Sequence, residues 1–235
     1  MVTLTSGATL HYVYDPLCGW CYGAAPLIKA ARNLVTVKAY AGGMMAGARK
    51  QKVTPQLREF VASHDKEIAQ RSGQPFGTAY FDGLLRDNSA VFDSEPPIAA
   101  FLAAEQLSGR GLDMVSRLQK AHYEEGQKIA DRSVLIEMAA SIGLDAVEFD
   151  RQLKTIEGAG VASHIRETRE FMAKYRLGGF PSAVLETEKG MEVVNLTAFL
   201  GNVDSFSEWL RDVVHVRSGG DLEAAPFCGI DGCVP

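Results

Sequence analysis

The chain has 235 residues, of which 46% are hydrophobic and 23% are charged, and its formal net charge is -5. This length allows one large domain or a core domain with an insertion, and the composition is that of an ordinary globular protein. The acidic balance argues against a general binder of nucleic acid or of anionic membranes. No stretch approaches the roughly 18 consecutive apolar residues of a membrane span, and residues 1–15 lack the basic and apolar segments of a signal peptide. We therefore expect a cytoplasmic protein with no nucleic-acid partner and no membrane partner.

The first predicted elements are a strand and a helix on either side of two cysteines. Residues 10–14 alternate as a strand does, and residues 22–34 have the apolar periodicity of a helix. Cys18 and Cys21 stand where that helix begins. A helix N-terminus offers unpaired N–H groups and a partial positive charge, and both stabilise a thiolate. After a strand, this C-x-x-C pair predicts thiol-disulfide exchange, with Cys18 as the nucleophile and Cys21 as the resolving thiol.

A second strand and a long run of helices come next. Residues 35–41 alternate with period two and end at two glycines, which predicts a strand followed by a turn. Thr54 and Pro55 are typical of an N-cap and a first helical position, and Asp145 with Glu148 forms a capping box. Apolar spacings of three and four predict helices over residues 54–68, 94–107, 112–122, 134–142, 145 onwards and 161–175.

Strand patterns return only near the C-terminus. Residues 182–186 and 191–195 predict a hairpin around the turn at Lys189 and Gly190, and Asp204 is expected to cap a last helix. Residues 218–221 have the composition of a flexible linker, and a short tail follows that contains Cys228 and Cys233.

The order of these elements predicts an α/β protein with a thioredoxin-like fold interrupted by a large all-helical insertion. Residues 1–52 and 173–217 supply four strands and two main helices, enough for a discontinuous thioredoxin-like domain. Residues 53–172 would form the helical insertion subdomain, and residues 218–235 a cysteine-containing tail.

The chain resembles the DsbA-like branch of the thioredoxin superfamily and, more narrowly, bacterial FrnE-like predicted protein-disulfide isomerases. The likeness extends over nearly the whole chain and rests on residues 15–23, on the helical insertion, and on residues 178–182, which open the third main strand. It implies a DsbA-like fold and an enzyme that acts on protein or peptide disulfides. It also implies that Pro181 is cis and lies against the two sulfurs, where its missing N–H leaves the preceding backbone free for an extended substrate.

Two residue choices depart from better-known relatives. Gly19 and Trp20 separate the cysteines, where oxidases of this fold often have Pro-His, and Phe180 stands where many relatives have a smaller residue. Gly-Trp supplies no charge that would favour a strong oxidant, so reductase or isomerase activity is the preferred interpretation. Trp20 and Phe180 are candidate substrate-binding residues together with Pro181. A ring packed over the helix start and a core residue at a strand start are the structural alternatives for the two aromatic residues.

The tail cysteines have several interpretations. Cys228 and Cys233 match the spacing of a C-terminal pair in some FrnE-like members, and we expect a second redox pair that exchanges with Cys18 and Cys21. A stabilising tail disulfide and unpaired thiols are the alternatives. A four-cysteine zinc site is disfavoured, because Cys21 would be buried beneath Cys18 in this fold. The five histidines have no ligand spacing, so we expect neither a metal nor a cofactor.

The favoured function is therefore a thiol-disulfide oxidoreductase, a reductase or isomerase, that uses the sequence Cys-Gly-Trp-Cys. Its partners would be protein or peptide thiols and disulfides, with glutathione or a thioredoxin-type protein as electron donor. One alternative is a glutathione-dependent transferase or isomerase on small molecules, although the intact cysteine pair argues against it. The other is a non-catalytic adaptor whose cysteines act as a redox switch.

Overall fold

A four-stranded mixed sheet forms one end of the molecule. The computed structural model describes residues 7–218. The strand order is β2-β1-β5-β6, and β1 runs parallel to β2 and antiparallel to β5. This is the predicted thioredoxin-like arrangement, and it places the chain segment after β1 at the end of a central strand. The strands are β1 (Thr9–Tyr14), β2 (Thr36–Ala41), β5 (Ser182–Thr187) and β6 (Gly190–Val194).

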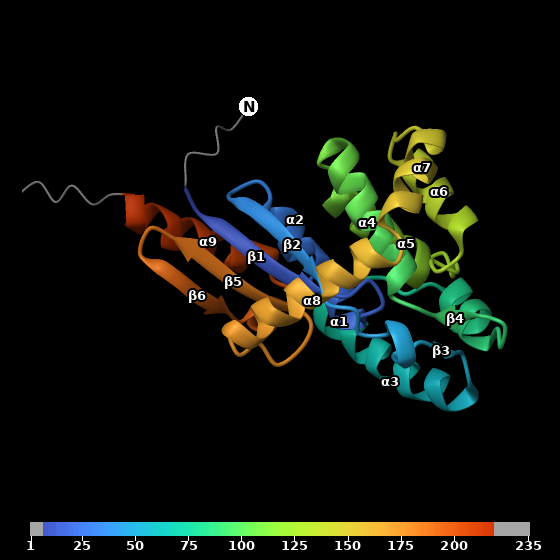
Figure 1. Ribbon diagram of the computed structural model, residues 1–235. Coiled ribbons are helices and arrows are strands. Elements are labelled where there is room, and N and C mark those ends of the chain that lie inside the picture. The colour runs from blue at the N-terminus through green and yellow to red at the C-terminus, as the bar shows by residue number, and fades with distance from the viewer. Residues whose placement is uncertain (1–6, 219–235) are drawn as a thin grey trace, which may run out of the picture.

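Helices cover both faces of this sheet, which explains why β1 is apolar on both sides. Leu10, Val13 and Tyr14 have no exposed surface. In Figure 1, α2 (Ala25–Ala31) and α9 (Val203–Ser218) lie behind the strands, and α8 (Ala159–Lys174) crosses in front of them. The C-terminal half of α8 packs against the sheet, because the ring of Phe171 on α8 stacks on that of Tyr40 on β2 with 4.7 Å between the ring centroids.

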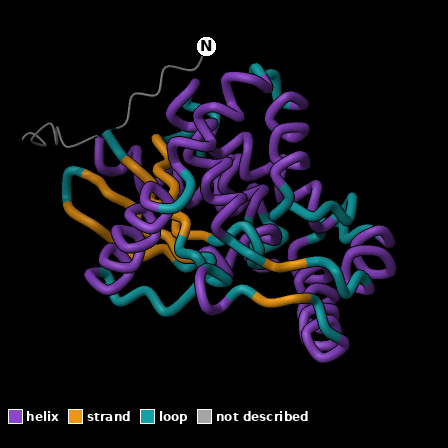
Figure 2. Tube along the Cα trace, turned by 45° about the vertical axis from the view of Figure 1, so that its right-hand side comes forward, coloured by secondary structure: helices purple, strands orange, loops and turns teal. Residues whose placement is uncertain are grey.

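The predicted helical part lies at the other end of the molecule. Two predicted caps are confirmed: Thr54 accepts a hydrogen bond from Leu57 N at 3.1 Å, and Asp145 accepts one from Glu148 N at 2.8 Å. Figure 2 shows this part as helices joined by loops beside the strands of the sheet. Its helices, besides α8, are α3 (Pro55–Ser72), α4 (Glu95–Ser108), α5 (Gly111–Tyr123), α6 (Arg132–Ser141) and α7 (Ala146–Ile156).

Short elements within this part carry no clear sequence pattern. Two-residue strands β3 (Gln51–Lys52) and β4 (Val91–Phe92) pair with each other, so the insertion contains one short strand among its helices. A strand of two residues is too short to show periodicity, and the sequence did not predict it. This part also has a π-helical turn over Ala79–Gly83 and a 3-10 turn over Leu84–Arg86, and 3-10 turns over Gly47–Arg49 and Leu196–Phe199 lie outside it.

The single helix predicted over residues 22–34 is wrong, because the chain forms two helices there. These are α1 (Gly19–Gly23) and α2, separated at Ala24. Pro26 has no N–H, so it cannot bond to the carbonyl of Tyr22 four residues earlier, and the helical ladder ends. Gln74 Nε2 donates to that carbonyl instead, at 3.2 Å.

The predicted cap of the last helix is also wrong by two residues. Ser205 N donates to Asn202 Oδ1 at 3.1 Å, so Asn202 is the residue that caps α9, and Asp204 lies within its first turn. An acidic residue in a first turn favours the helix through its dipole, which explains why the sequence pattern pointed to Asp204.

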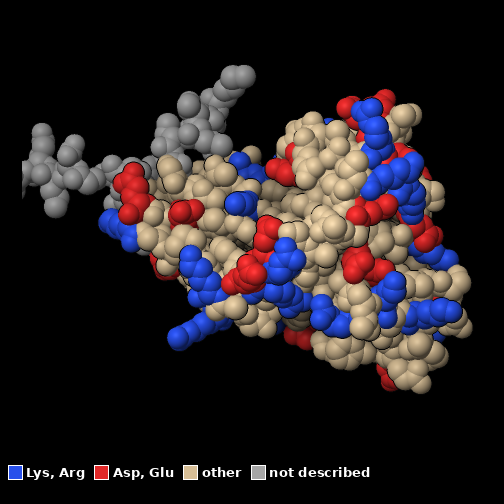
Figure 3. Space-filling model, viewed as in Figure 1, with Lys and Arg blue, Asp and Glu red and all other residues tan. Residues whose placement is uncertain are grey.

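Charged side chains of both signs are interspersed on the face shown in Figure 3. Within residues 7–218, no helix has the length and apolar character needed to cross a membrane.

Candidate active site

Cys18 lies between β1 and α1, at the position that caps the helix. Its backbone is extended (φ -92°, ψ 111°), and its Sγ accepts a hydrogen bond from Cys21 N at 3.4 Å. A sulfur that accepts an N–H at a helix start is placed to carry negative charge. The side chain is nearly covered, with 6% of its residue surface exposed, so a reacting partner must dock close to the surrounding residues.

The Cys18 sulfur contacts the backbone of Phe180, in the loop that enters β5. Cys18 Sγ lies 3.5 Å from the carbonyl oxygen of Phe180 and donates to it as a thiol. The peptide bond between Phe180 and Pro181 is cis, as the family resemblance implied. Residues separated by 162 positions therefore meet at one sulfur.

Cys21 lies one turn deeper and has no exposed surface. Burial and the neighbouring Cys18 raise its pKa well above the ordinary thiol value, so Cys21 rests as a protonated thiol. Both cysteines are free thiols in this structure. Tyr12, on the strand beneath, donates its hydroxyl to the backbone carbonyl of Cys21 at 3.4 Å, which completes a dry environment around the second sulfur.

Trp20 and Phe180 each pack against an arginine. The Arg71 guanidinium lies 5.1 Å from the Trp20 ring, and the Arg169 guanidinium lies 5.2 Å from the Phe180 ring. Both aromatic residues are partly buried and pack against the core.

Asp15 is a buried carboxylate between β1 and Cys18. It is fully buried, its Oδ1 accepts from Leu17 N at 2.9 Å and from the Ser94 hydroxyl at 2.9 Å, and its Oδ2 accepts from Met44 N at 2.6 Å. Burial raises the pKa of Asp15, and these three donors oppose that rise. The bond to Leu17 is the turn contact typical of an Asp-Pro sequence. The contacts to Met44 and Ser94 depend on the tertiary structure.

A loop with two glycines forms the floor beneath Phe180. A Cβ atom at Gly42 would lie 2.3 Å from the Phe180 ring, so the ring needs a glycine at that position. Arg169 Nε donates to the carbonyl of Gly42 at 2.7 Å, and an Arg49 guanidinium nitrogen donates to that of Gly43 at 2.7 Å. Sequence reasoning missed both arginines, because a charged residue on an amphipathic helix or in a loop gives no signal of which carbonyl it will reach.

Asp65 of α3 approaches the active-site helix from the helical part. A Cβ atom at Gly19 would lie 2.4 Å from Asp65 Oδ1, and the Tyr80 hydroxyl donates to Asp65 Oδ2 at 2.7 Å. Burial raises the pKa of Asp65 to about 6. The residue after Cys18 is thus in direct contact with a buried acid that the sequence pattern did not distinguish from other helix-face residues.

The remaining sequence candidates are the two tail cysteines and the histidines. Cys228 and Cys233 fall outside the described residues. Within residues 7–218, no group of three or more His, Cys, Asp or Glu side chains could hold a metal ion. His11 contacts Tyr40 and Glu186 at the sheet, and His164 accepts a hydrogen bond from the backbone of Ala41.

Comparison with known proteins agrees with this geometry. A family model described as a DSBA-like thioredoxin domain matches residues 9–204. The chain is similar to the cytosolic disulfide reductase DsbM from Pseudomonas aeruginosa, at 46% sequence identity and a TM-score of 0.84, over 88% of this chain and 99% of that one. A structure of DsbM with GSH matches at 45% identity, with a TM-score of 0.82 and the same coverage.

Two more distant proteins also match this chain. A candidate protein disulfide isomerase from Nitrosomonas europaea shares the fold, with a TM-score of 0.73 at 21% identity, over 90% of this chain and 99% of that one. The ClpXP adapter protein SpxH of Bacillus subtilis (strain 168) is 26% identical over 157 residues, which are 61% of this chain and 48% of the adapter. The aligned part thus spans about half the length of that curated relative. The family match agrees with the strand order of the sheet and with the Cys18 and Cys21 pair at the start of α1. The chain therefore belongs to the DSBA-like thioredoxin domain family, as a thiol-disulfide oxidoreductase.

Proposed function

We propose that this protein reduces or isomerises disulfide bonds of proteins or peptides in the cytoplasm, with Cys18 as the nucleophile. The observation that carries the proposal is the placement of the Cys18 sulfur, which caps α1 and touches the Phe180 carbonyl while Cys21 is buried behind it. The 46% identity to a cytosolic disulfide reductase supports both the reaction and the compartment.

The reaction follows from the different environments of the two sulfurs. The Cys18 thiolate attacks one sulfur of a substrate disulfide, forms a mixed disulfide with it, and releases the other substrate sulfur, which takes up a proton. The buried Cys21 stays protonated during this step, because its pKa is raised by burial. Cys21 then loses its proton and attacks the Cys18 sulfur, so the second substrate thiol leaves and a Cys18–Cys21 disulfide remains. Two electrons have passed from the enzyme to the substrate.

The substrate would dock along the rim of the site. The Phe180 carbonyl, in the residue before Pro181, lies 3.5 Å from the Cys18 sulfur. An extended peptide that brings its disulfide to Cys18 would run along this backbone, with Trp20 and Phe180 as the apolar contacts on either side. Isomerisation uses the same first step, with a second substrate thiol in place of Cys21 as the attacking group.

Regeneration requires a reductant, and glutathione is the candidate that we favour. Two glutathione thiols would reduce the Cys18–Cys21 disulfide and leave as glutathione disulfide, which restores both protein thiols. The DsbM structure with GSH supports a glutathione partner for this chain. A thioredoxin-type protein is the alternative donor. Cys228 and Cys233 are proposed as a second exchange pair, on the basis of their spacing and of the glycines beside them.

The proposal is tested by insulin reduction with glutathione as the electron source. We expect turnover by the full chain, none by Cys18→Ala, and an accumulated enzyme–insulin mixed disulfide with Cys21→Ala, visible by mass spectrometry under non-reducing conditions. Asp82→Asn, in an exposed ion pair with Arg86, is the control and should keep full activity. Turnover by Cys18→Ala would disprove the nucleophile assignment.

A second candidate function is an adaptor for a protease, and one observation favours it. The likeness to the ClpXP adapter SpxH covers 61% of this chain. An adaptor would accelerate degradation of a bound client by purified ClpXP. If the adaptor role needs no thiol chemistry, the variant with both Cys18 and Cys21 replaced by alanine would accelerate it equally. A reductase would lose all activity in that variant.

A further inference from the structure

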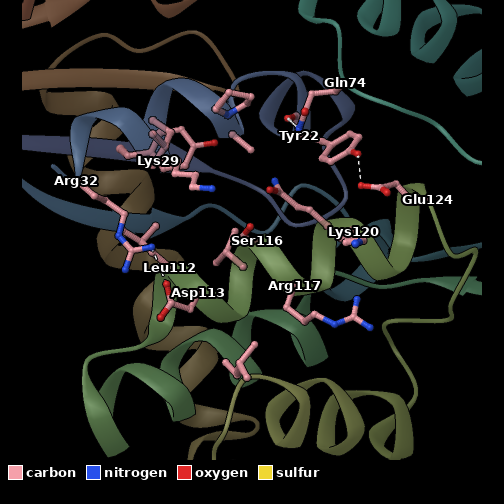
Figure 4. Close-up of a pocket in the computed structure, with 17 residues that line it drawn as sticks. Tyr22, Lys29, Arg32, Gln74, Leu112, Asp113, Ser116, Arg117, Lys120 and Glu124 are labelled. Atoms are coloured by element: carbon pink, nitrogen blue, oxygen red, sulfur yellow. Dashed lines mark hydrogen bonds and ion pairs between the residues drawn. The ribbon is translucent and has the colours of Figure 1, made fainter. Parts of the chain in front are cut away.

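A cavity lies between α2 and α5, and Tyr12 and Tyr22, which adjoin Cys21, form part of its wall. Its volume is about 600 Å3, and neither Cys18 nor Cys21 lines it. Figure 4 shows Lys29 of α2 and Arg32, just after the end of α2, on one side, and Asp113 and Ser116 of α5 on the other. Cavities of this size between two parts of a chain are typical sites for small organic ligands.

The charges on its wall are unequal. Four basic and two acidic side chains line the cavity. Two of the basic ones are already engaged: Arg32 binds Asp113 at 2.7 Å, and Arg117 binds Glu125 at 2.9 Å. The ammonium groups of the other two, Lys29 and Lys120, have no ion-pair or hydrogen-bond partner within the part of the chain that the structure describes.

A buried amide on the same wall also lacks a partner. Gln119 is 2% exposed, and its Nε2 makes no hydrogen bond to any described residue. Buried donors are normally paired, and a turn of the Gln119 side chain into the cavity would bring this N–H to an acceptor on a bound molecule. Gln119 lies next to Lys120 in the chain, which brings a neutral donor and a positive charge to one wall of the cavity.

The rest of the wall is apolar, so a simple inorganic ion would leave most of it uncovered. Ile28 from α2, Leu112 and Val115 from α5, and Ile142 from the end of α6 supply this surface. We propose that the cavity binds a small organic anion whose acidic group pairs with Lys29 and Lys120, whose acceptor meets Gln119, and whose apolar body lies against these side chains. The bound molecule would link α2 to α5.

The proposal is tested with two dyes of nearly the same shape on the full chain. The first is 8-anilinonaphthalene-1-sulfonate, an apolar anion, and the second is N-phenyl-1-naphthylamine, which lacks the sulfonate. We expect one sulfonate dye per chain, and an affinity about tenfold lower in the Lys29→Gln, Lys120→Gln double variant, because two charge-assisted contacts are lost. The neutral dye should bind the double variant as it binds the unchanged protein. Lys189→Gln, on the exposed turn between β5 and β6, is the matched control and should bind both dyes normally.

Two further variants locate the dye. Ser116→Trp, at an exposed position on the cavity wall, should fill the cavity and abolish the binding of both dyes. Cys18→Ala should bind the sulfonate dye as the unchanged protein does, since Cys18 does not line the cavity. Equal affinity of the double variant and the unchanged protein for the sulfonate dye would overturn the proposal, as would loss of binding in Cys18→Ala or no binding to the unchanged protein.

Discussion

At the scale of single residues, the site depends on a few buried polar atoms with one arrangement of partners. Asp15 is the strongest example, because its two oxygens accept from three separate segments: Leu17 after β1, Met44 after β2, and Ser94 before α4. The carboxylate therefore fixes the loop that carries Cys18 relative to the loop beneath Phe180. Any replacement must satisfy the same three donors.

The Asp15→Asn variant tests this role. In either orientation, its NH2 group would face the N–H of Met44 or of Leu17, and one buried donor would lose its acceptor. We expect a loss of about 1–3 kcal/mol in the free energy of unfolding. Urea denaturation measures the loss, and Asp82→Asn, in a pair that is exposed on both sides, should change stability little. Equal stability of the two variants would contradict this account of Asp15.

At the scale of elements, the site exists because segments distant in the sequence meet closely. The loop after β2 passes under the start of β5 so tightly that Gly42 and the Phe180 ring leave no room for a Cβ atom. On the other side, α3 lies against the start of α1, where Asp65 meets Gly19. Both contacts are made to a glycine.

Gly42→Ala should displace the Phe180 ring and with it the carbonyl that contacts Cys18. We expect an unfolding free energy lower by about 1–3 kcal/mol, the usual cost of an extra carbon in a packed site, and slower insulin reduction. Adding Phe180→Leu should restore part of the stability, because the smaller side chain makes room for the methyl group. Gly178→Ala is the matched control in the loop before Phe180, since a Cβ there meets no atom within 4 Å. A Gly42→Ala protein as stable and active as this control would show that the ring moves freely.

The buried Asp65, where α3 meets α1, should make the free energy of unfolding depend on pH. Its pKa in the folded protein is about 6 and the ordinary value is 3.8, so the folded state holds the proton more tightly than the unfolded state does. The resulting stabilisation is fully present below about pH 4 and is lost as the pH rises through about 6, with a total of about 3 kcal/mol.

Asp65→Asn should abolish this loss while keeping an oxygen for the Tyr80 hydroxyl. Between about pH 4 and pH 8, the free energy of unfolding of the unchanged protein should therefore fall by about 3 kcal/mol relative to that of the variant. The buried His122, whose pKa is lowered to about 3, contributes an opposite slope, but it is present in both proteins and cancels in the difference. Urea denaturation across this range makes the comparison, and parallel stability curves would exclude a raised Asp65 pKa.

At the scale of the whole molecule, the sheet and the helical part share one hydrophobic core. The ring of Tyr14 on β1 meets the edge of Phe101 on α4 at 5.7 Å, and Tyr22 on α1 stacks on Tyr123 of α5 at 4.8 Å. The active-site helix is therefore held between the two parts, as its central position in Figure 1 indicates. Strands and helices within residues 7–218 all contribute side chains to this core.

Because residues 218–221 have the composition of a flexible linker, we expect deletion of residues 219–235 to leave the melting temperature within a few degrees of that of the full chain. The Cys228→Ser, Cys233→Ser double variant should change the rate of disulfide isomerisation, measured with scrambled ribonuclease, more than the rate of insulin reduction. A collapse of the fold on deletion would show that the tail is a structural clasp. Unchanged rates in both assays would exclude the tail cysteines as an exchange pair.

The sequence by itself determined the order of the elements, the fold class and the position of the cysteine pair, because these depend on local periodicity, on capping residues and on a short motif. It also predicted the strand-to-helix turn at Cys18, since strand, cysteine and helix are adjacent in the chain. It missed the break at Ala24 and placed the cap of α9 on Asp204, where neighbouring residues offered competing local signals. Only the tertiary structure decided that Asp15 reaches Met44 and Ser94, that Arg169 reaches the carbonyl of Gly42, that Asp65 touches Gly19, and that α2 and α5 enclose a basic cavity. Such contacts join positions far apart in the chain, and no local preference of a residue encodes which distant backbone or side chain it will meet.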